Sequence, residues 1–329
     1  MPPKIREMQS NPSTPLVSTG NIRRLTLMLS GEDALDAADF GDKPSKGLPH
    51  ERYLLGELVP SAPILLLSQA NISIDPNESI ACLQPVHLHA TRDHLILMGQ
   101  NQIDLTEDES SKLLRSALPL IEEDFHHPVL FHNKQFWFLP AGPFTSLATY
   151  SVDQAHGRNI DWWMPRDSQE EGIAKRWRKL QNEIQMLWHI DPVNEAREQY
   201  GMPSINSIWI SGIGKLSDVN PPEPLKQSTY CYSDHPLLAG LAKFLGISYS
   251  PNLPNENLAG AFVWSNQPEL FWPKICASFT HHQIDELMLI DFPNGKLRER
   301  IFSVKDIYKK SWAFWKTKEL LTWSEVVSR

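Results

Sequence analysis

The sequence has few cysteines and no apolar run long enough to span a bilayer. Its three cysteines, Cys82, Cys231 and Cys276, are far apart, odd in number and never arranged as Cys-x-x-Cys. This usage favours a reduced, cytoplasmic protein over a disulfide-bonded secreted one. The start of the chain, 1–21, is polar and proline-rich and lacks the apolar core of a secretory signal. We therefore expect a disordered tail over 1–21 and no membrane span.

Excess positive charge is also missing. The 329 residues carry 31 Lys and Arg against 39 Asp and Glu, a formal net charge of −8. Broad nucleic-acid binding needs a basic footprint, so we expect no nucleic-acid partner. Apolar content of 41% and charged content of 21% are ordinary for a globular chain that buries a large core.

Motifs of several enzyme classes are absent. The chain contains no Gly-x-Ser-x-Gly elbow, no Walker lysine motif, no Gly-x-Gly-x-x-Gly, no His-Glu-x-x-His and no EF-hand loop. The residues alone therefore indicate no catalytic group, no metal ligand set and no cofactor.

The most informative stretch is 176–216. In Trp177–His189, apolar residues recur three or four apart, which predicts an amphipathic helix. Asp191-Pro192 predicts a break and a new N-cap, with a short helix over Val193–Tyr200. A buried strand over Ile205–Ile210 is expected next, leaving through a loop at Ser211–Gly214. In α/β proteins such a loop is a common place for a ligand.

The remaining pattern alternates strands and helices, with two hairpins in its first half. Strands are expected over Leu25–Leu29, Tyr230–Tyr232, Ala261–Trp264 and Glu286–Asp291; hairpins over Cys82–Met98 and Val129–Leu139; and helices over Arg52–Val59, Glu107–Phe125, His235–Leu245, Leu270–His281 and Val304–Val327. Ile64–Leu67 fits either a strand or the start of a helix. This order favours an α/β fold with an inserted α+β unit. We expect a tail over 1–21, a first part of the α/β core over 22–80, the inserted unit over 81–165, and the rest of the core over 166–329.

Five residues form the candidate ligand-binding site: Asn194, Arg197, Asn206, Gly212 and Gly214. Asn194 and Arg197 share a helix face, and an arginine fork suits a carboxylate or phosphate. Backbone N–H groups at Gly212 and Gly214 could face a phosphate. The alternative is structural: Arg197 pairs with an acidic neighbour, the asparagines bond to backbone, and the glycines make a turn.

Two further hypotheses stay open. His87 and His89 share a strand face and could hold a metal with the nearby His94; the alternative is hydrogen-bonded histidines. A rearranged two-metal site would need His87 and His89 to converge with His281, His282, Asp285 and Asp291. The Trp- and Lys-rich segment after Val304 could contact a partner, or pack its aromatic residues on its own domain.

The ordered combination of motifs resembles a known family. The residues that carry the resemblance are Leu105–Glu109, Asp191–Asn194, Arg197, Gly201, Pro203, Asn206, Ile208-Trp209, Gly212–Gly214 and His235–Gly246. They resemble archaeal-type cofactor-independent phosphoglycerate mutases, of the alkaline-phosphatase superfamily. Pro85–Leu88, Arg92–Leu95 and Asn182–Leu187 look like signatures of shorter bacterial regulatory proteins, the RpfE type.

The resemblance implies an alkaline-phosphatase/phosphoglycerate-mutase-like sheet with helices on its faces. It also implies two divalent metals, Mn or Mg, and a phosphorylated Ser nucleophile. Here the first strand leads to Ser30-Gly31 where the family has Asp-Gly, and no matching Ser motif is evident. We therefore expect a catalytically degenerate relative with a regulatory or metabolite-binding role and without cofactor. Its expected partners are a small phosphorylated or carboxylated metabolite, another protein, or a second copy of the chain. The alternatives are an active phosphomutase or phosphatase with rearranged ligands, and a pure interaction protein.

Overall fold

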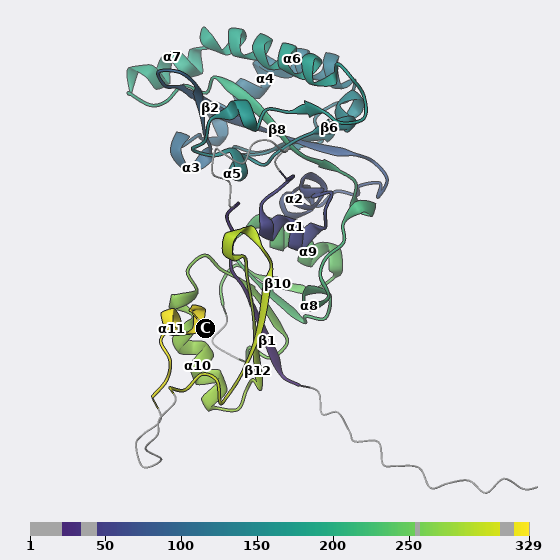
Figure 1. Ribbon diagram of the computed structural model, residues 1–329. Coiled ribbons are helices and arrows are strands. Elements are labelled where there is room, and N and C mark those ends of the chain that lie inside the picture. The colour runs from purple at the N-terminus through teal and green to yellow at the C-terminus, as the bar shows by residue number, and fades with distance from the viewer. Residues whose placement is uncertain (1–21, 34–44, 254–256, 310–318, 329) are drawn as a thin grey trace, which may run out of the picture.

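Two large sheets with helices between them make up most of the described structure, and a two-stranded sheet completes it (Figure 1). The computed structural model describes residues 22–33, 45–253, 257–309 and 319–328. The expected tail over 1–21 lies outside the described residues. In the described part of the chain, no helix combines the length and apolar composition needed to cross a bilayer.

The first sheet has six strands in the order β10-β9-β11-β1-β12-β13. Its strands are β1 (Arg24–Met28), β9 (Tyr230–Tyr232), β10 (Ser248–Ser250), β11 (Ala261–Trp264), β12 (Glu286–Asp291) and β13 (Arg298–Ser303). All neighbours are parallel except β12 and β13, which form an antiparallel edge. Such a sheet is buried on both faces, which explains why β1 and β12 read as continuous apolar runs.

The alternation of side chains along β1 and β12 separates two cores. Leu27 and Leu289 face one core, which is completed by α10 (Trp272–Thr280) and α11 (Trp323–Val327). Met28 and Ile290 face the other, which is completed by α1 (Pro49–Leu55), α2 (Ser61–Gln69) and α9 (Pro236–Leu245). Helices thus cover both faces, and the predicted α/β class is confirmed.

The second sheet is antiparallel and is built around one long strand. Its members are β2 (Ile80–Ala90), β3 (Leu95–Met98), β4 (Phe131–His132), β5 (Trp137–Pro140) and β8 (Ser207–Gly214). β2 pairs with β3, β5 and β8. Both predicted hairpins are confirmed, whereas the pairing of β8 with β2 brings a strand from beyond residue 165 into this unit.

Two long helices, α4 (Glu107–Phe125) and α6 (Ile173–His189), cover one face of the antiparallel sheet. The predicted apolar stripe of α6 is buried there, and its members are Trp177, Leu180, Ile184 and Trp188. Thr106 caps α4 with the expected capping box to Glu109. Asp191 caps α7 (Pro192–Gln199) through the Val193 N–H at 2.9 Å, as predicted.

Shorter elements complete the chain. They are α3 (Gln100–Ile103), α5 (Val152–Ala155), α8 (Glu223–Lys226) and the two-stranded pair β6 (Leu147–Ala148) with β7 (Arg166–Asp167).

The predicted glycine loop at Ser211–Gly214 is wrong. β8 continues through these residues, and its partner is antiparallel rather than parallel. Gly212 has φ +64°, and a Cβ there would lie 2.3 Å from the Ser61 Oγ. The glycines are therefore explained by the close approach of α2, not by an open loop.

Two helix predictions also need correction, and one open alternative is decided. For Ile64–Leu67 the helical alternative is confirmed, because the segment lies in α2. The helix expected over Arg52–Val59 begins earlier, at Pro49, and ends at Leu55, with Gly56 as its C-cap. The long C-terminal helix expected over Val304–Val327 is wrong in its described part. There, Tyr308 and Leu320 form a β-bridge and only Trp323–Val327 is helical. Residues 310–318 lie outside the described residues.

Candidate functional site

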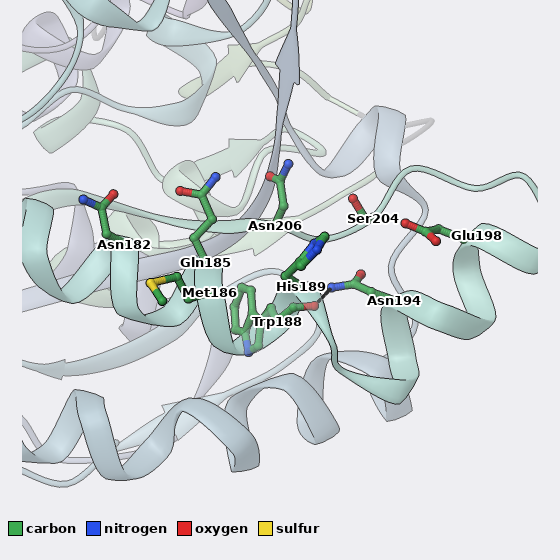
Figure 2. Close-up of a pocket in the computed structure, with 9 residues that line it drawn as sticks. All are labelled: Asn182, Gln185, Met186, Trp188, His189, Asn194, Glu198, Ser204 and Asn206. Atoms are coloured by element: carbon green, nitrogen blue, oxygen red, sulfur yellow. Dashed lines mark hydrogen bonds between the residues drawn. The ribbon is translucent and has the colours of Figure 1, made fainter.

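A cavity of about 600 Å³ lies in the angle between α6 and α7 (Figure 2). Its volume is in the usual range for small-molecule sites, about 300–1,000 Å³. It is lined by Asn182, Gln185, Met186, Trp188, His189, Asn194, Glu198, Ser204 and Asn206. Most of the lining residues have polar side chains, and they include two of the five predicted site residues, Asn194 and Asn206.

The helical period of α6 presents one wall of this pocket. Asn182, Gln185, Met186 and His189 follow at spacings of three, four and seven from the first, so they share one face. The opposite face carries the buried stripe that ends at Trp188. The amphipathic pattern that fixes α6 on the core therefore also fixes which side chains meet the cavity.

Two asparagines hold the remaining walls in place. The Asn194 amide donates to the Trp188 carbonyl at 2.8 Å and to the Ile205 carbonyl at 2.9 Å, and its oxygen accepts from the Ile205 N–H. Asn206 exchanges two hydrogen bonds with the backbone of Leu88, a residue of β2. These bonds tie α6, α7 and the 204–206 segment to one another and to the sheet.

Five other lining side chains are open to a ligand. Within the described residues, no hydrogen bond or ion pair engages the side chains of Asn182, Gln185, His189, Glu198 and Ser204. Together they offer two amides, an imidazole, a hydroxyl and a carboxylate. Met186 adds an apolar thioether and is 75% exposed. The pocket can thus both donate and accept hydrogen bonds.

Arg197 does not line the pocket, although it lies on α7. Its side chain is fully buried and donates to the carbonyls of Pro203 and Ile103 and to the Glu109 carboxylate at 2.9 Å. The Arg197 guanidinium therefore bonds to groups of the protein itself. This matches the structural alternative, in which Arg197 pairs with an acidic neighbour instead of a ligand. Gly212 and Gly214 also lie away from the cavity, against Ser61 and Pro60 at the start of α2.

The carboxyl ends of the parallel strands hold a second polar cluster, which the sequence patterns did not reveal. The rings of His50 and His235 both pack on Trp264, at centroid distances of 5.2 and 4.2 Å. The indole N–H of Trp264 donates to the Ser30 hydroxyl, which donates to Asn266. These residues are distant in sequence. Ser30, His235 and Asn266 follow strands β1, β9 and β11, so they could have been grouped from the sequence only if the order of these strands were known.

Burial sets the protonation states in this cluster. Desolvation lowers the pKa of His50 to about 4, helped by the nearby His235. Desolvation also lowers the pKa of His235, against the opposing effect of Asp153 and Asp234. Both imidazoles are therefore neutral near pH 7.

Glu51 lies beside this cluster and shows the opposite shift. Its pKa is raised to about 7, mainly by burial and also by the neighbouring Asp153 and Asp33, against the opposing effect of hydrogen bonds from Leu48 and Ser151. Its Oε2 accepts from the Leu48 N–H at 2.6 Å and from the Ser151 hydroxyl at 3.2 Å. A carboxyl that is half-protonated at neutral pH inside a protein can exchange a proton there.

The residues proposed for a rearranged metal site do not converge. His87 and His89 lie on β2, in the antiparallel sheet, and the His87 Nδ1 bonds the Ser204 carbonyl at 2.7 Å. His281, His282 and Asp285 precede β12, whereas Asp291 ends it. Asp285 pairs with Arg23, and Asp291 pairs with Arg298 and Arg300. Across the described residues, no group of three or more His, Cys, Asp and Glu is placed to hold a metal.

Comparison with known proteins gives structural neighbours only. No family model matches the sequence, and no curated protein matches it. The PH0037 protein from Pyrococcus horikoshii is 9% identical, with 82% of each chain covered and a TM-score of 0.39. A cofactor-independent phosphoglycerate mutase from Thermoplasma acidophilum is 12% identical, with 85% of this chain and 89% of that chain covered and a TM-score of 0.35.

Proposed function

We propose that this protein is a small-molecule-binding regulatory protein, a phosphoglycerate mutase-like chain that has lost phosphoryl transfer. The observation that carries the binding role is the pocket between α6 and α7, where five polar side chains have no partner among the described residues. Polar groups left open in a concave site are the usual mark of ligand recognition. The ligand is a small polar metabolite, and no cofactor is required for binding it.

The loss of phosphoryl transfer is supported by the contacts of Ser30 and Asp291, which lie at the carboxyl ends of β1 and β12. Ser30 is hydrogen-bonded to Asn266 and Trp264. The Asp291 carboxylate is held by two arginines, with Nη–Oδ2 distances of 2.6 Å each. A carboxylate neutralised by arginines is a poor ligand for Mn²⁺ or Mg²⁺, because the cations compete for the same oxygens. An assay for mutase activity with either metal tests this point, and robust turnover would contradict it.

The binding role is tested by a thermal-shift screen of small metabolites, including phosphorylated and carboxylated compounds. We expect at least one class to raise the melting temperature of the wild-type protein. Gln185→Ala removes an open amide from the pocket and should reduce that shift. Lys179→Ala is the matched control, since Lys179 is exposed on the same helix and does not line the cavity. Equal shifts in both variants would place the ligand elsewhere.

Protein interaction is a second candidate function, favoured by one observation. Met186, Ile190 and Tyr200, which lie on α6 and at the ends of α6 and α7, are 75%, 72% and 79% exposed. Large exposed apolar side chains on consecutive helices are candidates for an interaction surface. The partner would be another protein or a second copy of the chain. Light scattering of wild type and of Ile190→Ser tests the second copy: a monomer in both cases would rule out that form.

A further inference from the structure

The charges around the pocket limit the chemistry of its ligand. No Lys or Arg is among the nine lining residues, and Glu198 is the formally charged side chain among them. Within the described residues, Glu198 has no ion-pair partner. The nearest arginine on the same helix, Arg197, is buried and paired with Glu109.

The cations that precede Asn182 on α6 are not among the lining residues. Arg178 donates to the Ala174 carbonyl at 3.3 Å, away from the cavity. Lys179, one turn before Asn182 on α6, pairs with Glu183 at 3.5 Å. The Asp191 carboxylate caps α7. His87, behind Ser204, has its pKa lowered by burial, so its ring is neutral at pH 7. The cavity therefore presents a carboxylate, an imidazole and several amide and hydroxyl dipoles to whatever enters it.

From this arrangement we propose that the pocket selects a small molecule with a protonated amine and neutral hydrogen-bonding groups, and rejects phosphorylated metabolites. The ammonium group meets the Glu198 carboxylate, because a free carboxylate stabilises a cation and repels an anion. The amides of Asn182 and Gln185 pair with neutral groups such as a carboxamide, since each offers both donors and an acceptor. This inference rests on the proposed function and goes beyond it by naming the ligand class.

The proposal differs from the phosphate-binding hypothesis drawn from Arg197 and the Gly212–Gly214 segment. A phosphate needs charged or backbone donors gathered in one place. Here the guanidinium of Arg197 is bonded within the protein and both glycines pack on α2. What remains in the cavity suits a cation or a neutral polar group.

Isothermal titration calorimetry with three probe sets tests the proposal. The first set contains leucinamide and glutaminamide, which carry an ammonium and a carboxamide. The second contains their N-acetyl derivatives, which lack the positive charge. The third contains 3-phosphoglycerate and inorganic phosphate. We expect binding of the first set, and at least about tenfold weaker binding of the second, because one charge-assisted bond is lost.

Two glutamates on α7 give a matched pair of variants. Glu198→Gln should weaken binding of the amino-acid amides about tenfold, since it removes the charge and keeps the shape. Glu195→Gln, an exposed residue that does not line the pocket, should leave the affinity unchanged. Equal effects of the two variants would overturn the role of Glu198.

The other outcomes separate this inference from the proposed function. Binding of the phosphorylated probes that is weakened by Gln185→Ala overturns the ligand class and keeps the pocket as a binding site. Binding of none of the three probe sets overturns both the ligand class and the binding role assigned to this pocket.

Discussion

Glu51→Gln should stabilise the protein, and the gain should depend on pH. Glu51 is 6% exposed, its pKa is raised from 4.5 to about 7, and burial is the largest cause. Arg52, the next residue, lies 3.6 Å from Asp33, and among the described residues no cation pairs with Glu51. Ionising this carboxyl therefore costs free energy that folding must offset.

The direction of the pH dependence of stability follows from the raised pKa of Glu51. Below pH 4.5 the carboxyl is protonated in both the folded and the unfolded chain, so it contributes no pH dependence. Between pH 4.5 and about 7 the unfolded chain loses its proton first, and stability falls. The difference between the two pKa values corresponds to about 3 kcal/mol, an upper bound because the protein can relax around the charge. Glutamine copies the protonated form and can still accept from the Leu48 N–H.

The assay is urea denaturation, followed by tryptophan fluorescence, of wild type and variant between pH 4 and pH 8. We expect the two free energies of unfolding to be similar near pH 4.5. The variant should be more stable by up to about 3 kcal/mol above pH 7. Glu57→Gln, an exposed glutamate just after the same helix, is the control and should show no such trend. A difference that is constant with pH, or a less stable variant at pH 8, would refute the reasoning.

The comparison must be between variant and wild type because His50 acts in the opposite direction. Its pKa is lowered to about 4, so its contribution to stability is lost as the pH falls from 6.5 towards 4. The two windows overlap, and the wild-type profile alone would show little slope. Subtracting the wild-type curve removes the contribution of His50.

Three further predictions test the core rather than the pocket. Arg197→Met should destabilise the protein by about 3 kcal/mol or more in urea denaturation, because it leaves Glu109 and two carbonyls without their buried partner; a change below about 1 kcal/mol would contradict the structural role. Gly212→Ala should cost more than Gly201→Ala: both residues have positive φ, but a Cβ at Gly212 meets Ser61 at 2.3 Å, whereas one at Gly201 meets nothing within 4 Å. We expect about 1 kcal/mol for Gly201→Ala and clearly more for Gly212→Ala, and equal thermal shifts would be inconsistent with the close contact. All three cysteines are buried, and burial raises the pKa of the Cys231 thiol to about 12, so native protein should react slowly with a thiol reagent and fully in urea; fast labelling of native protein would exclude this packing.

Local signals predicted the elements well where one residue determines a boundary. Thr106 with Glu109 marked the start of α4, and Asp191-Pro192 marked the start of α7. The side chains that make these caps are neighbours in sequence, so the pattern contains the whole interaction. The C-terminal helix was overpredicted because a helical period does not show long-range pairing: in the described part of the segment, Tyr308 and Leu320 form a β-bridge.

Partners distant in sequence could not be predicted from such patterns. β8 reads as a buried strand in the sequence, but nothing local shows that it pairs antiparallel with β2. The same limit applies to the pocket. The polar face at Asn182 and Gln185 has the pattern of any solvated helix face. The pocket arises from the angle of α7 and from the bonds between Asn206 and Leu88, which are 118 residues apart.

The position of α2 has a mechanical consequence. One side of this helix meets β8, where Ser61 leaves no room for a side chain at Gly212; its other side meets α9, where a Cβ on Gly240 would lie 2.0 Å from the Ile64 carbonyl. A strand of the antiparallel sheet and a helix that covers the parallel sheet therefore both contact α2 at backbone distance. Rotating one sheet against the other would bring main-chain atoms into collision at these contacts, so α2 opposes a hinge motion between the two sheets.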